Sequence, residues 1–276
     1  MTSADTHATV VPIQRPPQDI VERAVCAFHD VWAELARAFS GGSSVVRDRV
    51  VRARSGVLLA PFNGVWGLDA NVSRPAVLAA IEDFEVGSLP WNVQLRPPYA
   101  DWVDDEFARR NLVRTEDIPF MVLTDPSRLA AAISATPATF RRAVSYRDVD
   151  NLLTLLEHGF GLPPEVAREA FPLRMLTSPE ITSWIAATTE DVSTSMGYLH
   201  GGLCGVFSVA TPEQHRGRGY GAAVTAQTVR EGLAAGATAA YLQASPLGHP
   251  VYERLGFVTV ERWRQWMPRE HAETAS

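Results

Sequence analysis

The feature that most constrains this chain is a glycine-rich stretch between an apolar segment and a segment with helical spacing. The apolar run from Leu203 to Ala210 is predicted to be a buried strand, and Val224 to Ala235 is predicted to be a helix. Glycines without a Cβ let successive backbone N–H groups converge, and the dipole of the following helix adds positive potential. We therefore predict a pyrophosphate-binding loop, with an ordinary tight turn as the alternative, in Gln214-His215-Arg216-Gly217-Arg218-Gly219-Tyr220-Gly221-Ala222-Ala223.

Two familiar nucleotide-binding loops do not fit this stretch. A dinucleotide-binding fingerprint needs G-x-G-x-x-G and an acidic residue at the end of the next strand. Here the glycines follow G-x-G-x-G, and the next predicted strand, 239–244, runs into Gln243-Ala244-Ser245. A Walker-type phosphate loop needs a lysine. All 25 basic residues of this chain are arginine, so that loop is excluded as well.

The stretch resembles the Q-x-x-G-x-G coenzyme A loop of the GNAT N-acyltransferases, on Gln214, Gly217 and Gly219. A second segment agrees, because Ser245 to Phe257 resembles the short helix of that family with Tyr-x-x-Leu-Gly-Phe, here beginning at Tyr252. Two motifs in the right order are more specific than either alone. The resemblance implies an α/β (α+β) fold with two GNAT-like domains, each a mixed, mostly antiparallel sheet flanked by helices.

The predicted elements of the N-terminal half follow the same order as those of the C-terminal half, which suggests two copies of one domain. Phe107 then occupies the place of Tyr252, Asn111 that of the motif glycine, and no glycine-rich loop lies between Asp69 and Phe84. This resembles a degenerate GNAT copy in a tandem arrangement similar to that of mycothiol synthase; the alternative is an unrelated α/β extension. The predicted boundaries are a flexible N-terminus at 1–17, the degenerate domain at 18–129, a linker at 130–138, the catalytic domain at 139–270 and a flexible tail at 271–276.

The resemblance also implies where acetyl-CoA binds. In the family, the strand before the loop splays from its neighbour, so that its free edge binds the pantetheine arm. The backbone N–H groups of Arg216 to Ala222 are expected to bind the pyrophosphate, and that of Val209 to polarise the thioester carbonyl. The predicted cofactor-binding residues are Phe207, Ser208, Val209, Ala210, Gln214, Arg216, Gly217, Arg218, Gly219, Tyr220, Gly221, Ala222 and Ser245.

Tyr252 is the predicted general acid, because the family places a tyrosine at this motif position beside the sulfur, and a phenol can protonate a departing thiolate. Ser245 is expected to hydrogen-bond the pantetheine or to orient the helix of Tyr252. The general base stays open among His200, Glu190, Asp191, Glu213 and water. Aromatic residues on the predicted strands either line an acceptor pocket or belong to the core, namely Trp184, Tyr198, Trp263 and Trp266.

Composition limits the remaining possibilities. The net charge of −6 argues against a nucleic-acid surface. The seven histidines show no metal-ligand spacing, so we expect no metal. We expect no signal peptide and no membrane span, and hence a cytoplasmic protein. Cys26 and Cys204 are expected to be reduced core residues.

These observations predict an N-acetyltransferase that moves an acetyl group from acetyl-CoA to a primary amine of a small molecule or amino acid by direct attack. A non-catalytic coenzyme A-binding regulator and an acyltransferase for a longer acyl-CoA are the alternatives. The oligomeric state stays open, a homodimer included.

Overall fold

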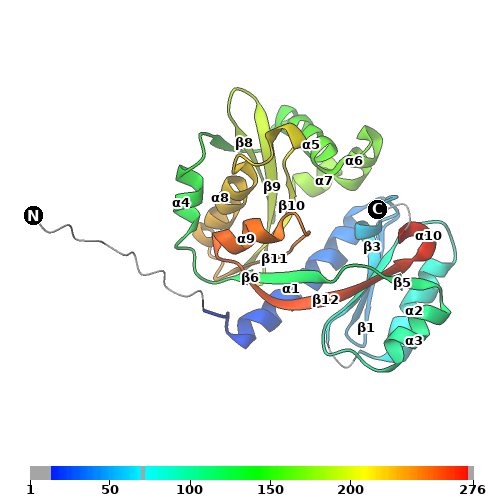
Figure 1. The fold of residues 1–276 in the computed structure, drawn as a ribbon. Helices are drawn as coiled ribbons and strands as arrows, with labels where there is room; N and C mark the ends of the chain where they lie inside the picture. The colour runs from blue at the N-terminus through cyan, green and yellow to red at the C-terminus, as the bar shows by residue number, and fades with distance from the viewer. Residues whose placement is uncertain (1–13, 70–71, 273–276) are drawn as a thin grey trace, which may run out of the picture.

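The computed structural model describes residues 14–69 and 72–272, which form one sheet with helices on both faces (Figure 1). Of the twelve strands in the described residues, eleven follow the order β1-β2-β3-β4-β12-β6-β11-β10-β9-β8-β7, and the twelfth, β5, pairs with β12 off this path. Their bounds are β1 Ser43–Arg47, β2 Val50–Arg54, β3 Asn63–Gly67, β4 Asn92–Leu95, β5 Leu112–Arg114, β6 Ile118–Leu123, β7 Thr139–Arg142, β8 Ile181–Ala187, β9 Asp191–His200, β10 Leu203–Ala210, β11 Ala240–Gln243 and β12 Val258–Pro268.

Helices of both halves cover this sheet. The α-helices are α1 Gln18–Ala38, α2 Arg74–Glu85, α3 Trp102–Arg109, α4 Leu129–Ser134, α5 Tyr146–Phe160, α6 Pro164–Ala170, α7 Leu173–Leu176, α8 Tyr220–Ala234, α9 His249–Leu255 and α10 Arg269–Ala272, and short 3₁₀ turns span Ala60–Phe62 and Glu213–His215. Among the described strands only β3–β4 and β10–β11 pair in parallel. The mixed, mostly antiparallel α/β fold predicted from the sequence is therefore confirmed.

The two halves of the chain exchange strands. β6, from the N-terminal half, lies between β11 and β12, where Leu123 pairs with Ala240 and Val122 with Val258. β12 in turn continues into the N-terminal half, where Arg264 pairs with Leu95 of β4. Figure 1 shows β6 and β12 running side by side between the two parts of the molecule. Each half of the sheet is thus completed by a strand of the other half.

Helix α1 packs across this junction. Its apolar stripe, which includes Val21, Val25 and Phe28, is buried against strands of both halves. Phe28 meets Trp263 of β12 edge to face at 5.4 Å between ring centroids, and Trp263 stacks on Phe120 of β6 at 4.9 Å. Such aromatic burial is among the largest contributions that single side chains make to a core. The amphipathic helix predicted near the N-terminus is therefore a shared element of both halves.

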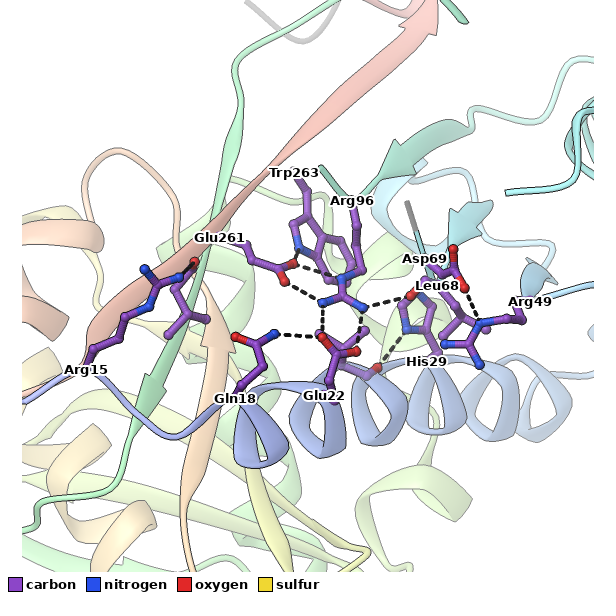
Figure 2. A network of polar contacts seen from close by, with 12 residues as sticks. Arg15, Gln18, Glu22, His29, Arg49, Leu68, Asp69, Arg96, Glu261 and Trp263 are labelled. Atoms are coloured by element: carbon purple, nitrogen blue, oxygen red, sulfur yellow. Dashed lines mark hydrogen bonds and ion pairs between the residues drawn. The ribbon is translucent and has the colours of Figure 1, made fainter. Parts of the chain in front are cut away.

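A buried arginine adds a polar link at the same place (Figure 2). Arg96, which follows β4, is 6% exposed, and its guanidinium lies between the carboxylates of Glu22 on α1 and Glu261 on β12. It also donates to the backbone carbonyl of Leu68 at 2.9 Å. The indole N–H of Trp263 donates to Glu261 at 2.7 Å. All three nitrogens of the Arg96 guanidinium therefore donate hydrogen bonds within the protein, as a buried polar group requires.

Several expectations about segments need adjustment. The predicted linker, 130–138, contains most of α4, whose Leu129 is buried and which packs on α8. The predicted flexible ends lie largely outside the described residues, at 1–13 and 273–276. Cys26 is exposed, so its assignment to the core is wrong, because it falls outside the buried stripe of α1; Cys204 is buried. Within the described residues, no helix combines the length and apolarity that a bilayer crossing requires.

Candidate active site

A cavity of about 380 Å³ lies at the N-terminal end of helix α8. It is bounded by the end of α5, by the loop 211–222 and by the loop and helix that carry Tyr252. The predicted residues that line it are Val209, Arg216, Gly217, Gly219, Tyr220, Gly221, Ala222, Ser245 and Tyr252. The structure therefore brings the two sequence motifs together around one cavity, although they lie far apart along the chain.

The glycine-rich loop has the geometry of an anion-binding turn. Gly217 and Gly219 adopt the left-handed region, with φ of 74° and 82°, and Gly219 directly precedes helix α8. A side chain at Gly219 would be strained in this conformation. The backbone N–H groups of residues 217–222 have no hydrogen-bond acceptor among the described residues. Such free N–H groups at a helix N-terminus are suited to bind phosphate oxygens.

Arg216 departs from the expectation. Its backbone N–H donates to the carbonyl of Glu213 at 3.1 Å, so it is not free for a pyrophosphate. Its guanidinium donates to the carbonyls of Thr211 and Gly159, each at 3.1 Å, and thereby ties the loop to the end of α5. Arg216 thus supports the loop, while its side chain still borders the cavity.

Strands β10 and β11 separate beside this loop. They pair at Cys204↔Ala240 and Gly205↔Tyr241, and beyond Gly205 no strand of the described residues pairs with β10 on that side. A bulge on the other side of β10 puts Ser208 at a φ of 51° and leaves it and Val209 out of the register with β9. Val209 then lines the cavity. The predicted splaying of these strands is therefore present in the structure.

Tyr252 lies on α9 with its side chain buried, at 8% exposure. Its ring packs on Gly248, where a Cβ would approach the ring to 2.8 Å, and edge to face on Phe257 at 6.0 Å. Burial raises the pKa of Tyr252 to about 12, so the phenol keeps its proton at neutral pH. The hydroxyl has no hydrogen-bond partner in the described part of the chain and belongs to a residue that lines the cavity.

Ser245 positions the helix that carries this tyrosine. Its Oγ accepts from the N–H of Gly248 at 3.1 Å, and its carbonyl accepts from the N–H of His249 at 2.9 Å. Of the two roles expected for Ser245, orientation of α9 agrees with these contacts. A hydrogen bond to pantetheine stays a prediction.

Five of the predicted cofactor-binding residues do not line the cavity: Phe207, Ser208, Ala210, Gln214 and Arg218. Phe207 turns toward α1, where its ring meets Trp32 at 6.3 Å. The carbonyl of Ala210 accepts from the hydroxyl of Ser193 at 2.9 Å. Arg218 instead lines a neighbouring groove with Arg128 and Arg254, beside Gly219. Among the described residues no carboxylate lies within 4.0 Å of these three guanidinium groups, so the groove is positively charged.

None of the four side chains considered as general base lines the cavity. His200 Nε2 lies 3.3 Å from Asp30 on α1, and Asp191 forms a bidentate pair with Arg141. Glu190 lies 3.8 Å from the Nε2 of His215. His215 was not considered, yet it is buried and lines the cavity, and its Nδ1 has no partner among the described atoms.

Other cavity residues also escaped the sequence analysis. Gly159 and Phe160 come from the end of α5, Thr211 precedes the glycine-rich loop, and Leu247, Val251 and Arg254 lie within the segment Ser245 to Phe257 at positions for which no role was predicted. From one sequence, a cavity residue can be recognised by its position in a motif, but not by its position in space. Of the aromatic residues considered for an acceptor pocket, Trp263, Trp266 and Tyr198 are buried in the core.

The sequence matches no known family model and no curated protein sequence. Solved structures, however, are similar over nearly the whole chain. A GCN5-related N-acetyltransferase from Kribbella flavida is 15% identical, with a TM-score of 0.66 over 90% of this chain and 95% of that one. One from Sphaerobacter thermophilus is 18% identical, with a TM-score of 0.57 over 92% and 93%. A GCN5-related N-acetyltransferase-like protein from Streptococcus suis is 14% identical, with a TM-score of 0.56 over 90% and 97%.

These similarities show that the chain has the GNAT fold. At such identities the similarity shows the fold alone, and a fold does not decide an acceptor. In the described part of the chain, no three histidine, cysteine or acidic side chains are grouped so as to hold a metal ion.

Proposed function

We propose that this protein is an N-acetyltransferase that transfers the acetyl group of acetyl-CoA to a primary amine of a small molecule by direct attack. One observation carries the proposal: a single cavity joins free N–H groups at a helix start, an unpaired strand edge and a buried phenol. These three features match the three needs of the reaction, which are to fix the donor, to stabilise an oxyanion and to protonate a thiolate.

The N–H groups of residues 217–222 would bind the pyrophosphate. The groove lined by Arg128, Arg218 and Arg254 adjoins Gly219, and its positive charge would compensate the phosphates of the nucleotide end. The free edge of β10 beyond Gly205 would pair with the amide groups of the pantetheine arm, as an added strand would. The pyrophosphate, the phosphates of the nucleotide end and the pantetheine amides would thus each have a group of the protein to bind them.

The chemistry follows from the residues at the far end of this path. The amine nitrogen would bond to the acyl carbon while the N–H of Val209 polarises the thioester carbonyl. The carbon–sulfur bond then breaks and Tyr252 gives its proton to the sulfur, while the proton that the amine nitrogen gives up passes through water to the Tyr252 phenolate and restores the phenol. Because burial keeps the phenol protonated, Tyr252 is ready to act as an acid at neutral pH.

We also propose that the N-terminal half is a degenerate copy of the same domain. Asn111 adopts the left-handed conformation after α3, with a φ of 57°, and Gly256 does so after α9, with a φ of 100°. Phe107 packs on Trp266 where its counterpart Tyr252 packs on Phe257. The hydroxyl that the proposed chemistry needs is missing from the first copy.

Release of free thiol from acetyl-CoA across a panel of amines tests the proposal. A transferase releases thiol in proportion to added amine, with a matching mass gain of one acetyl group on the acceptor. A coenzyme A-binding regulator would bind acetyl-CoA in calorimetry yet release no thiol with any amine. A transferase for longer chains would release thiol faster from butyryl- or octanoyl-CoA than from acetyl-CoA.

A further inference from the structure

A second cavity, of about 770 Å³, lies between the two halves of the chain. It is lined from α1 by Trp32, from β3 by Trp66, and from β4, β12 and the end of β11 by three glutamines, Gln94, Gln265 and Gln243. Its size is within the range of small-molecule sites. Ser245 lines both this cavity and the first one, so the two adjoin where β11 ends.

The two cavities lie on opposite faces of the sheet. Side chains alternate along β11: Ala240 and Leu242 pack on the side of α8 and α9, and Tyr241 packs on the side of α1. Gln243 follows this alternation and therefore belongs to the α1 side. A donor held at the start of α8 would meet an acceptor from the second cavity through the gap between β10 and β11.

The three glutamines form a hydrogen-bonded chain with a defined direction. The hydroxyl of Thr115 donates to the backbone carbonyl of Gln265, which can only accept, and accepts from the Nε2 of Gln265 at 3.0 Å. Gln94 then donates to the Oε1 of Gln265 at 3.1 Å, and Gln243 donates to the Oε1 of Gln94 at 2.8 Å. This series of hydrogen bonds therefore leaves the side-chain carbonyl oxygen of Gln243, Oε1, as an acceptor without a partner among the described residues.

The charged groups of the lining are all acidic. Glu116 is exposed and forms no ion pair among the described residues, while Asp117 pairs with Arg114 at 2.8 Å. No arginine or histidine of the described chain lines this cavity. The same cavity is lined by the indoles of Trp32 and Trp66, which stack at 5.4 Å with an interplanar angle of 12°. Aromatic faces and carboxylates both favour a cation over an anion.

We propose that this second cavity is the acceptor site and that it takes a primary amine on an uncharged body, while it rejects amines that also carry a carboxylate or a phosphate. This inference rests on the function proposed above. Glu116, whose carboxylate has no ion pair among the described residues, attracts the ammonium form, and the side-chain carbonyl of Gln243 accepts an N–H of the neutral amine near the gap. An added anionic group meets no counter-cation in the lining, so free amino acids and phosphorylated amines are poor acceptors.

Matched pairs of acceptors test this directly. Tyramine and tyrosine, tryptamine and tryptophan, and glucosamine and glucosamine 6-phosphate differ within each pair only by an anionic group. By thiol release, we expect kcat/KM for the first member of each pair to exceed that of the second by roughly tenfold or more. Glu116→Gln is expected to reduce this preference several-fold without changing the KM of acetyl-CoA. Glu165→Gln, an exposed carboxylate on α6, is the matched control and is expected to leave it unchanged.

Binding separates this inference from the proposed function. Tryptophan fluorescence and calorimetry follow the same pairs without acetyl-CoA, and the same order of affinity is expected, weakened in Gln243→Leu. If no amine releases thiol but the order of binding holds, the transferase proposal fails and the acceptor-class inference stands. If the anionic members bind or react as well as the others, or if no member of any pair binds, the inference is overturned. Because Glu116 is exposed in the connection between β5 and β6, its variant keeps the test valid even where Gln243→Leu does not fold.

Discussion

Arg96 and Glu261 face each other as a bidentate pair, although one follows a strand of the N-terminal half and the other lies on the last strand of the chain. The Nε of Arg96 donates to Oε2 of Glu261 at 2.9 Å, and Nη2 donates to Oε1 (Figure 2). Both side chains are largely buried, at 6% and 12% exposure. Such parallel hydrogen bonds combine charge with directional specificity. The pair therefore fixes how the two halves meet.

Arg96→Met is expected to lower the free energy of unfolding by roughly 3–5 kcal/mol, because it leaves Glu261 buried without its partner. Urea denaturation followed by far-UV circular dichroism measures this loss. Arg114→Met removes an exposed ion pair with Asp117 and should cost about 0–1 kcal/mol. Equal losses in the two variants would contradict the role given to Arg96.

The same junction predicts how stability depends on pH. The hydrogen bond from Arg96 lowers the pKa of Glu22 in the folded protein. The ionised Glu22 carboxylate therefore contributes to the free energy of unfolding at pH values above the ordinary carboxyl pKa. As pH falls below that value toward the lowered pKa, protonation removes the contribution and stability declines. In thermal melts between pH 7 and pH 3, the melting temperature of the wild type should fall more steeply than that of Glu22→Gln, whose side chain cannot titrate. Parallel curves would contradict the prediction.

Gly219→Val is expected to weaken acetyl-CoA binding roughly tenfold or more, which corresponds to about 1.4 kcal/mol per decade. A branched side chain is strained at this positive φ, and it would displace the N–H groups that face the phosphates. Calorimetric titration measures the dissociation constant. Gly236→Val is the matched control, because Gly236 has a φ of 101° in open space after the far end of α8. Unchanged donor affinity in a folded Gly219→Val protein would refute the assignment of this loop.

Tyr252→Phe should lower kcat by roughly 10²-fold and leave donor affinity unchanged, because only the acidic hydroxyl is lost. Steady-state kinetics with one acceptor at saturation measures the effect, and Tyr146→Phe, at an exposed tyrosine of α5, is the control. With a pKa of about 12, Tyr252 should produce no fall in kcat below about pH 10. A kcat within a factor of about two of the wild type would show that Tyr252 is structural.

The N-terminal half should bind no nucleotide but should be needed for folding. Titration with acetyl-CoA should therefore give one site per chain. A fragment that begins at Ala132 lacks β6, so β11 and β12 would lose the strand between them, and we expect the fragment to be insoluble. Coexpression of residues 1–131 with residues 132–276 should restore solubility. Two donor sites per chain, or a soluble and active C-terminal fragment, would contradict this division of roles.

Sequence patterns predicted those elements that depend on local order. The strand 203–210 has the bounds that the sequence predicts, because a continuous apolar run marks it. The hairpin of β1 and β2 was missed, because β1 is largely exposed and lacks an alternating pattern. Helix α8 begins at Tyr220, earlier than its apolar spacing at Val224 indicated, because the glycine turn itself starts the helix.

The site was predictable only where a motif marks it. Tyr252 and the loop glycines were found, because their spacing is recognisable in one sequence. The chain of Gln94, Gln243 and Gln265 was not, because its members lie on three strands that no periodicity links. Arg218 was assigned to the phosphate loop by adjacency, yet its side chain lines the neighbouring groove. A single sequence does not show which distant segments come into contact, so these features could not be predicted from it.

The exchange of β6 and β12 also determines the order in which the protein can mature on the ribosome. β6 emerges early, but its neighbours β11 and β12 are among the last segments to be synthesised. Neither edge of β6 can therefore be paired until translation is nearly complete, and contacts so distant along the chain form slowly. A nascent chain stalled before Val258 holds a sheet that is open in both halves at once. Loss of a few C-terminal residues of β12 would for the same reason damage the domain that is synthesised first.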